Sequence, residues 1–160
     1  DIAVRFPNLV LGVVALNAVY QRDTAASKAV MARAANLDGH SMPDSSGTLE
    51  RWFGTAASPA RDACRNWLNS VDPKGYAAAY RVFASEDGPA PADLATLRCP
   101  ALFMTGSKEP NSTPAMSHAM ALLAPRGRAS IIEGAAHMMP MTHPNQVNAA
   151  LLEFAQDCFQ

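Results

Sequence analysis

Glu109 and His137 are the two residues whose types and positions best suit acid–base chemistry. Glu109 lies four residues beyond the apolar run 101–105, and His137 lies five residues beyond the run that ends at Ile132. A neutral imidazole can take up and return a proton near neutral pH, and carboxylates take part in the same chemistry. The pair therefore predicts a proton-transfer site. The alternative is an ordinary loop histidine and a solvated carboxylate beside Lys108.

Two short strands and one helix would position this pair. The run 101–105 is apolar, unbroken and closed by Gly106, which is typical of a parallel strand buried on both faces. The run 129–132 predicts a second strand, which turns into the histidine loop at Glu133-Gly134. Between them, Thr113-Pro114 predicts the N-cap and the first position of a helix. Open α/β sheets bind ligands at the carboxyl ends of their strands, so both loops should meet at that edge.

Two segments carry a resemblance to a known family. They are CPALFMTGSKEP, which begins at Cys99, and IIEGAAHMMPMTHPNQVNAALLEF, which begins at Ile131. Together they resemble the C-terminal part of an α/β-hydrolase, in which the catalytic acid follows one strand and the catalytic histidine follows the last. The resemblance implies an α/β fold that consists of the C-terminal half of an α/β-hydrolase parallel sheet with an inserted helical cap.

The same resemblance implies a role for each of the two residues. Glu109 matches the triad acid, where many members have Asp, and His137 matches the triad base. In these roles His137 would take a proton from a serine and return it to the leaving group. Glu109 would hold the ring in one tautomer and stabilise the imidazolium that forms. Glu133 is a competing acid, but its place in the turn at the strand end favours a structural role.

The beginning of the chain predicts a helix end followed by a strand. Residues 1–6 are typical of the last turns of a helix that ends before Pro7, and Leu9–Leu16 is the most apolar run in the sequence. In α/β-hydrolases such a segment follows the nucleophile elbow, so the resemblance implies that the Gly-x-Ser-x-Gly turn lies upstream of Asp1. We therefore expect a fragment, or one piece of a nicked protein, whose partner is the N-terminal segment that carries the nucleophile. A complete, independently folding protein is the alternative, and its sheet would keep an open apolar edge.

The middle of the chain interrupts the strand pattern with helices. Four segments indicate helices or their starts: Asp23-Thr24, Ser46–Phe53, Ser58-Pro59 and Asp72-Pro73. The predicted organisation is a hydrolase core of residues 1–22 and 99–160 with a helical cap of residues 23–98. The cap is similar to that of 3-oxoadipate enol-lactonase and its relatives.

Two of the predicted helices show an apolar face. In the third cap helix the face consists of Ala60, Cys64, Trp67 and Leu68; in the C-terminal helix, which begins at Pro144, it consists of Val147, Leu151, Phe154 and Cys158. We expect the face of the C-terminal helix to pack on the sheet.

Four residues are candidates for contact with a substrate: Asn17, Trp52, Tyr76 and Met138. Asn17 lies just past the end of its strand, and the two aromatic residues lie in the cap. Met138 adjoins the histidine in a methionine-rich segment, and methionine suits pockets for apolar ligands. Packing is the alternative for the methionine and for both aromatic residues.

Ser41 lies in a sequence, Gly39-His40-Ser41, that imitates the first half of a nucleophile elbow. An elbow requires a strand before it, a helix after it and a second small residue for the sharp turn. The residues before Ser41 are predicted to be helical, and Pro43-Asp44 follows it. A position in a loop of the cap is therefore favoured over a nucleophilic role.

Composition limits the partners and the compartment. The 160 residues are 49% hydrophobic, which is enough for a core, and 13 basic with 14 acidic residues give a net charge of -1 without charged blocks. A nucleic-acid partner is therefore not indicated. The three cysteines are far apart and odd in number, which favours a reducing compartment, with a disulfide as the alternative. No apolar run is long enough to span a bilayer, so we expect a cytoplasmic protein without a membrane partner.

The combined expectation is a serine-type hydrolase that cleaves a small carboxylic ester or lactone without a metal or an organic cofactor. By resemblance, an enol-lactone is the nearest named substrate. The same fold is used by cofactor-free haloperoxidases, amidases and carbon–carbon bond hydrolases, and the fold alone does not choose among them. A non-catalytic member that keeps its pocket for a ligand is the remaining alternative.

Overall fold

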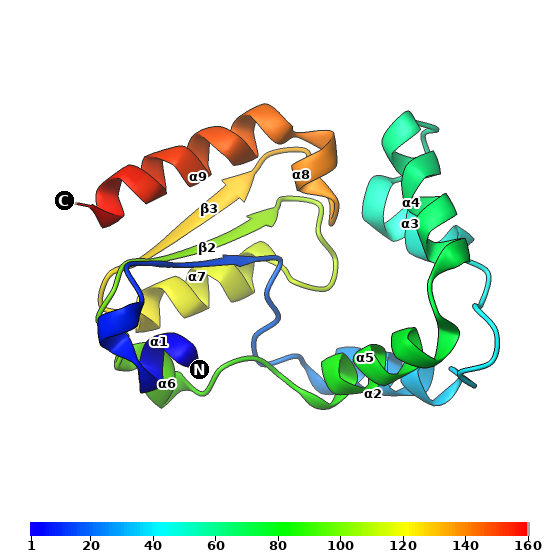
Figure 1. Cartoon of the computed structure of the whole chain (residues 1–160), viewed down its shortest axis with the longest axis horizontal. Helices are drawn as coiled ribbons and strands as arrows, with labels where there is room; N and C mark the ends of the chain where they lie inside the picture. Colours follow the sequence, from blue (N-terminus) through cyan, green and yellow to red (C-terminus); the bar gives the residue numbers. More distant parts are fainter. Residues whose placement is uncertain (160) are drawn as a thin grey trace. The chain divides into compact units, whose positions relative to one another are not determined.

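The computed structural model describes residues 1–159, which form two compact units (Figure 1). The sheet unit comprises residues 1–20 together with the chain from Gly88 onward. The helical unit comprises residues 21–87. These units place residues 88–98 with the sheet, and the assignment of the two regions as a hydrolase core and a cap stays a prediction.

The sheet unit alternates strands with helices along the chain. Its elements are α1 (Ile2–Arg5), the 3₁₀ helix η1 (Pro7–Leu9), β1 (Val13–Leu16), α6 (Pro91–Ala95), β2 (Ala101–Gly106), α7 (Pro114–Leu123), β3 (Gly127–Ile132), α8 (Met139–Thr142) and α9 (Pro144–Cys158). The three strands are parallel, and β2 lies between β1 and β3. This arrangement confirms the predicted α/β class with a parallel sheet.

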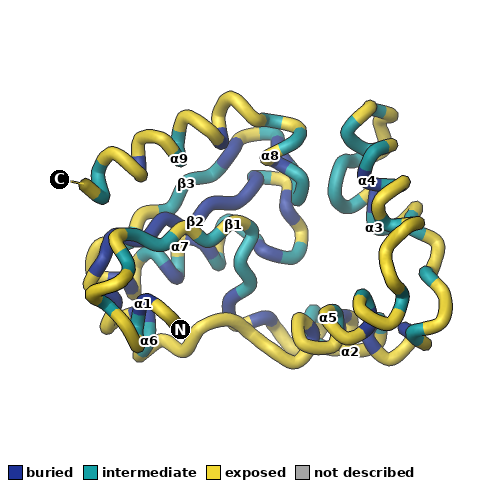
Figure 2. The backbone as a smooth tube through the Cα atoms, viewed as in Figure 1, coloured by how far each residue is buried: buried dark blue, intermediate teal, exposed yellow. Residues whose placement is uncertain are grey.

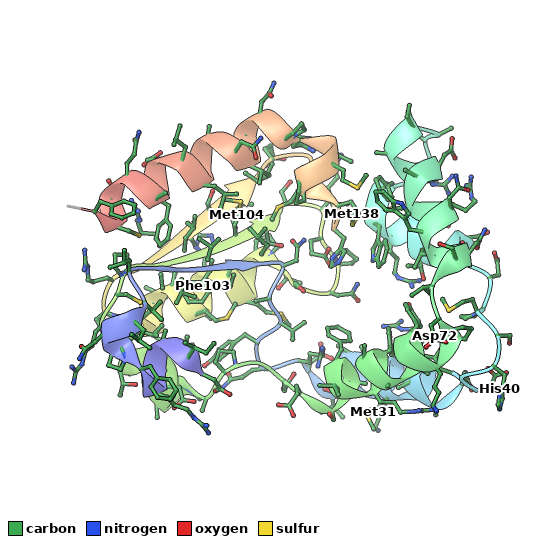
Figure 3. All side chains as sticks on the ribbon, in the orientation of Figure 1. Met31, His40, Asp72, Phe103, Met104 and Met138 are labelled. Atoms are coloured by element: carbon green, nitrogen blue, oxygen red, sulfur yellow. The ribbon has the colours of Figure 1, made fainter. Side chains whose placement is uncertain are left out.

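β2 is the centre of this sheet and is buried along its whole length. Its alternate side chains pack in opposite cores: Ala101 and Phe103 in one, Leu102 and Met104 in the other (Figure 3). A strand presents successive side chains to opposite faces, so a strand covered on both faces must be apolar throughout. The unbroken apolar run in the sequence has this physical cause.

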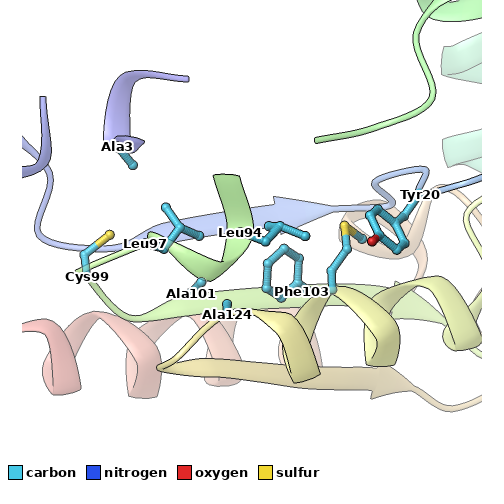
Figure 4. Packing of buried hydrophobic residues seen from close by; sticks show 9 residues of the cluster. Ala3, Tyr20, Leu94, Leu97, Cys99, Ala101, Phe103 and Ala124 are labelled. Atoms are coloured by element: carbon cyan, nitrogen blue, oxygen red, sulfur yellow. The ribbon is translucent and has the colours of Figure 1, made fainter. Parts of the chain in front are cut away.

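Each face of the sheet carries its own core. The buried residues of the first core are Ala3, Tyr20, Leu94, Leu97, Cys99, Ala101, Phe103, Met120 and Ala124 (Figure 4), and those of the second are Leu102, Met104, Ile132, Ala135, Met139, Val147 and Phe154. Leu94 belongs to α6, which explains why residues 88–98 go with the sheet unit although they were predicted as part of the cap. Every residue of β2 is buried, whereas much of α9 is exposed (Figure 2).

β1 is shorter than the predicted strand Leu9–Leu16 and begins only at Val13. Its register pairs Val13 with Ala101, the first residue of β2, so residues 9–12 have no opposite residue of β2 to bond. Within residues 1–159, β1 pairs with β2 alone, and Val14 and Leu16 are exposed. The predicted strand is therefore confirmed over Val13–Leu16 and wrong at Leu9, which lies in η1.

The helical unit contains α2 (Thr24–Ala35), α3 (Ser46–Phe53), α4 (Pro59–Ser70) and α5 (Pro73–Ser85). The predicted N-caps are confirmed, because the side chains of Asp23, Ser58 and Asp72 each accept a hydrogen bond from the backbone N–H three residues later. On the predicted apolar face of α4, Cys64 is buried and Trp67 is 60% exposed. Among the helices of residues 1–159, none has both the length and the apolar character that crossing a bilayer demands.

Candidate active site

Glu109 lies in the loop after β2, and its side chain is fully buried. Its Oε1 accepts hydrogen bonds from the backbone N–H groups of Asn111, at 2.7 Å, and Ser112, at 3.2 Å. Its Oε2 lies 2.8 Å from Nδ1 of His137, whose side chain is 32% exposed. The structure thus brings together the two residues that the sequence predicts as acid and base.

The hydrogen bonds around Glu109 keep its carboxylate charged. Burial raises the pKa of the Glu109 carboxyl, but the bond with His137 and the backbone N–H donors outweigh burial and lower the pKa below its usual value. An ionised carboxylate can only accept hydrogen bonds, so Nδ1 of His137 carries the ring proton. In the neutral imidazole the lone pair then lies on Nε2, which is the nitrogen able to accept a proton from a reacting group.

Backbone contacts hold the acid loop against the histidine loop. The N–H of Ser107 donates to the carbonyl oxygen of Ile132 at 3.0 Å, and the N–H of Lys108 donates to that of Ala135 at 2.9 Å. Gly106 permits this close approach, because a Cβ at this position would lie 2.2 Å from the carbonyl oxygen of Ala135. The pairing of β2 with β3 therefore continues into the two loops and sets the distance between acid and base.

Asn17 holds the backbone of the histidine loop. It is the first residue after β1, and its φ of 49° is a left-handed value that asparagine tolerates better than most residues. Its Nδ2 donates to the carbonyl oxygen of His137 at 2.6 Å, and its Oδ1 lies 3.0 Å from the hydroxyl of Thr105. Both polar atoms of this side chain are bonded within the protein, and contact of Asn17 with substrate stays a prediction.

Thr105 and Ser112 belong to the site although the sequence analysis missed them. Both are buried, and the Thr105 hydroxyl donates to the carbonyl oxygen of Ser112 at 2.7 Å. The signal in the sequence is a hydroxyl at the end of an otherwise apolar strand. A buried hydroxyl needs a hydrogen-bond partner, so Thr105 at this edge of the sheet points to a polar network.

The other predicted substrate contacts are half-buried. Met138 follows His137 in the same loop (Figure 3). Trp52 on α3 and Tyr76 on α5 belong to the helical unit. Tyr76 stacks on Tyr80 with 6.0 Å between ring centroids, and burial raises the pKa of the Tyr76 phenol. A role in substrate binding stays a prediction for all three.

Ser41 lacks the surroundings of a nucleophile elbow. It is exposed in the loop between α2 and α3, with no strand before it and no helix directly after it. Its hydroxyl donates to Oδ2 of Asp38 at 3.2 Å. The backbone N–H groups of Ser41 and His40 lower the pKa of the Asp38 carboxyl, so this loop is organised around that carboxylate.

Glu133 and His118 are titratable residues that lie on the surface. Glu133 is exposed and accepts a hydrogen bond from the Ser107 hydroxyl at 3.1 Å, which is consistent with a structural role. His118 is exposed on α7. In the described part of the chain, residues 1–159, no group of three or more His, Cys, Asp or Glu side chains could hold a metal ion.

Comparisons with known proteins agree with this architecture. No protein-family model matches the chain. A curated relative, (E)-2-((N-methylformamido)methylene)succinate hydrolase from Acinetobacter baylyi, is 40% identical over 153 residues, which cover 94% of this chain and 57% of the relative. The chain thus spans little more than half the length of this relative.

Two solved structures share the fold. The thermophilic esterase from Thermogutta terrifontis has a TM-score of 0.74 and 21% identity, covering 99% of this chain and 60% of the esterase. The enol-lactonase from Burkholderia xenovorans has a TM-score of 0.74 and 20% identity, covering 97% of this chain and 60% of the lactonase.

The parallel sheet with an acid after one strand and a histidine after the next has the fold of the C-terminal part of an α/β-hydrolase. Within this class the chain is similar to enol-lactonase, and its curated relative is also a hydrolase. The predicted resemblance is therefore confirmed.

Proposed function

We propose that this chain supplies the general base His137 and its orienting acid Glu109 to a serine-type α/β-hydrolase that cleaves a small carboxylic ester or lactone. The observation that supports this most strongly is the 2.8 Å contact between Nδ1 of His137 and Oε2 of a fully buried Glu109. The charge on Glu109 fixes the tautomer in which Nε2 is basic. This is the protonation state that a general base for a serine hydroxyl requires.

In the proposed reaction His137 moves one proton in each of four steps. As the serine oxygen attacks the acyl carbon, its proton passes to Nε2, and Glu109 stabilises the imidazolium without becoming protonated. Nε2 then protonates the leaving oxygen, which leaves an acyl-enzyme. Water attacks the acyl carbon as Nε2 takes the water proton, and Nε2 returns a proton to the serine as the acid departs.

We propose further that the serine comes from a Gly-x-Ser-x-Gly segment that precedes residue 1 in the natural protein. The length of the curated relative, of which this chain covers 57%, supports this proposal. The lack of a strand and a helix around Ser41 also supports it. That segment would be the protein partner of this chain, and the small ester or lactone its substrate.

Amide hydrolysis is the second candidate, and one observation favours it. The curated relative at 40% identity is named for a succinate that carries an N-methylformamido group, which is an amide. The same base and acid can cleave an amide if His137 protonates the departing nitrogen. A substrate with both a carboxylate and an amide therefore belongs in the first panel of compounds.

The test compares esters, lactones and amides as substrates of the natural-length protein that contains this chain. We expect His137→Ala to reduce kcat by at least about 10³-fold. His118→Ala, an exposed histidine on α7, is the matched control and should leave kcat unchanged. A His137→Ala protein that keeps its folding and most of its turnover would refute the proposal.

A fluorophosphonate label identifies the nucleophile in the same protein. We expect the labelled serine to lie in the segment before residue 1 and Ser41→Ala to be labelled like the wild type. Label on Ser41 would place the nucleophile in the helical unit instead.

A further inference from the structure

Five residues of the candidate site close a ring of hydrogen bonds. The N–H of Ser112 donates to Oε1 of Glu109 at 3.2 Å, and the Thr105 hydroxyl lies 2.7 Å from the carbonyl oxygen of Ser112. The same hydroxyl lies 3.0 Å from Oδ1 of Asn17, whose Nδ2 donates to the carbonyl oxygen of His137 at 2.6 Å. Nδ1 of His137 donates to Oε2 of Glu109 at 2.8 Å, which closes the ring. Three of the five contacts join segments that are far apart in the sequence, with separations of 28, 88 and 120 residues. The ring therefore ties the acid loop, the end of β1 and the histidine loop into one closed network.

We propose that Asn17 and Thr105 are positioning residues that fix the orientation of the His137 imidazole toward the reacting group. Glu109 holds one end of His137 through the ring nitrogen, and Asn17 holds the other end through the backbone carbonyl. The bond to Glu109 restrains the ring, and the bond from Asn17 restrains the backbone from which the ring projects. Together they favour one orientation of the imidazole.

Thr105 links the acid loop to Asn17 by sharing its single hydroxyl proton between two acceptors. The carbonyl oxygen of Ser112 and Oδ1 of Asn17 both lie within hydrogen-bond distance of this hydroxyl. Ser112 also donates its N–H to Glu109, so a shift of Thr105 moves both the acid loop and the histidine loop. Thr105 is fully buried, so water cannot replace the missing bonds without a change in packing.

The expected effect of this network on kcat rests on the proposed function, but its effect on the orientation of the His137 ring does not. A misplacement of about 1 Å in a catalytic group can cost about 10²-fold in rate, so loss of the ring should lower kcat by about 10-fold to 100-fold. In this proposal the side chains of Asn17 and Thr105 act on the orientation of the imidazole, so the loss should appear in kcat more than in KM. The Nδ1 proton of His137, which is slow to exchange while it is bonded to Glu109, should broaden or disappear from the NMR spectrum.

Paired variants separate the polar contacts from packing and backbone effects. Thr105→Val keeps the shape and removes the hydroxyl, whereas Thr105→Ser keeps the hydroxyl and removes a methyl group. Asn17→Gly removes the amide while it suits the left-handed backbone, and Gln21→Gly repeats the change at an exposed residue that has the same φ of 49°. The Nδ1 proton signal, kcat, KM and the thermal midpoint are measured for each.

We expect Thr105→Val and Asn17→Gly to lose the Nδ1 signal and kcat, and Thr105→Ser and Gln21→Gly to retain both. Wild-type signal and kcat in folded Asn17→Gly and Thr105→Val would overturn the proposal, as would a loss in Thr105→Ser that equals the loss in Thr105→Val. Loss of the Nδ1 signal in a protein whose wild type hydrolyses no acyl substrate would instead support the positioning role and refute the proposed function.

Discussion

Replacing Glu109 with glutamine should reverse the tautomer of His137. Oε1 of the glutamine can still accept the backbone N–H groups of Asn111 and Ser112, which leaves its Nε2 facing Nδ1 of His137. An amide nitrogen donates only, so Nδ1 must become the acceptor and the ring proton must move to the His137 Nε2. The nitrogen that should take the proton of the nucleophile would then already carry one.

Glu109→Gln should reduce turnover far more than it reduces stability. With the wrong tautomer we expect kcat to fall by about 10⁴-fold, the order found when a triad acid is changed to its amide. Stability should fall by only about 1 kcal/mol, because one hydrogen bond to a charged group becomes a neutral bond and both backbone bonds remain. Glu109→Ala should lower the free energy of unfolding by about 1–3 kcal/mol more, because it leaves the N–H of the buried Ser112 without an acceptor.

The assay is a long-range ¹⁵N–¹H NMR experiment that reports which nitrogen of His137 carries the proton. We expect Nδ1–H in the wild type and Nε2–H in Glu109→Gln, together with the loss of kcat in the natural-length protein. Glu133→Gln is the matched control, since Glu133 is exposed and accepts a hydrogen bond from the Ser107 hydroxyl, away from the contact between Glu109 and His137. A Glu109→Gln protein that keeps Nδ1–H, or that keeps kcat within about tenfold of the wild type, would refute the reasoning.

Two further predictions concern stability. The folded-state pKa of Glu109 is lowered, so its contribution is complete above the unfolded carboxyl pKa of about 4.3 and is lost as the pH falls through the folded value. Urea unfolding at a series of pH values should show this acid loss in the wild type, and an equal loss in Glu109→Gln would contradict the assignment. Gly106→Ala should destabilise the protein by about 1–3 kcal/mol, because its Cβ would meet the Ala135 carbonyl. Gly47→Ala is the control, since its Cβ would meet only the end of the Arg51 side chain at 3.6 Å, and equal thermal midpoints for the two variants would contradict the close-approach argument.

The helix starts could be predicted from the sequence because their chemistry is local. Asp23, Ser58, Asp72 and Thr113 each satisfy a backbone N–H three residues later, and three of the four precede a proline at the first helical position. These contacts depend on residues within one turn of helix. No information about the rest of the fold is needed to place them.

The packed faces of helices were less predictable because they depend on what covers them. In α9 the predicted face is confirmed, since Val147 and Phe154 are buried against the sheet. In α4 the same kind of pattern includes Cys64, which is buried, and Trp67, which is exposed. The helical period shows which side chains share a face, but it does not show how much of that face a neighbour will cover.

The candidate site was predictable in its residue types and not in its connections. An acid and a histidine after successive strands follow from the sequence and the edge at which parallel strands end. The bond from Asn17 to His137 joins residues 120 positions apart, and the bond from Thr105 to Asn17 joins residues 88 positions apart. Such contacts depend on the strand register, which the apolar pattern alone does not fix.

The register of the sheet is what gives Asn17 and Thr105 their place in the site. β1 pairs Leu16 with Met104, so one further step along both strands sets Asn17 beside Thr105. Side chains alternate between faces, so Thr105 shares the face of Phe103, which belongs to the first core, and Asn17 shares that of Ala15, which packs against this core. A slip of one residue would turn every β1 side chain to the opposite face and separate the amide from the hydroxyl. The apolar packing that prevents this slip thus also positions the polar ring around His137.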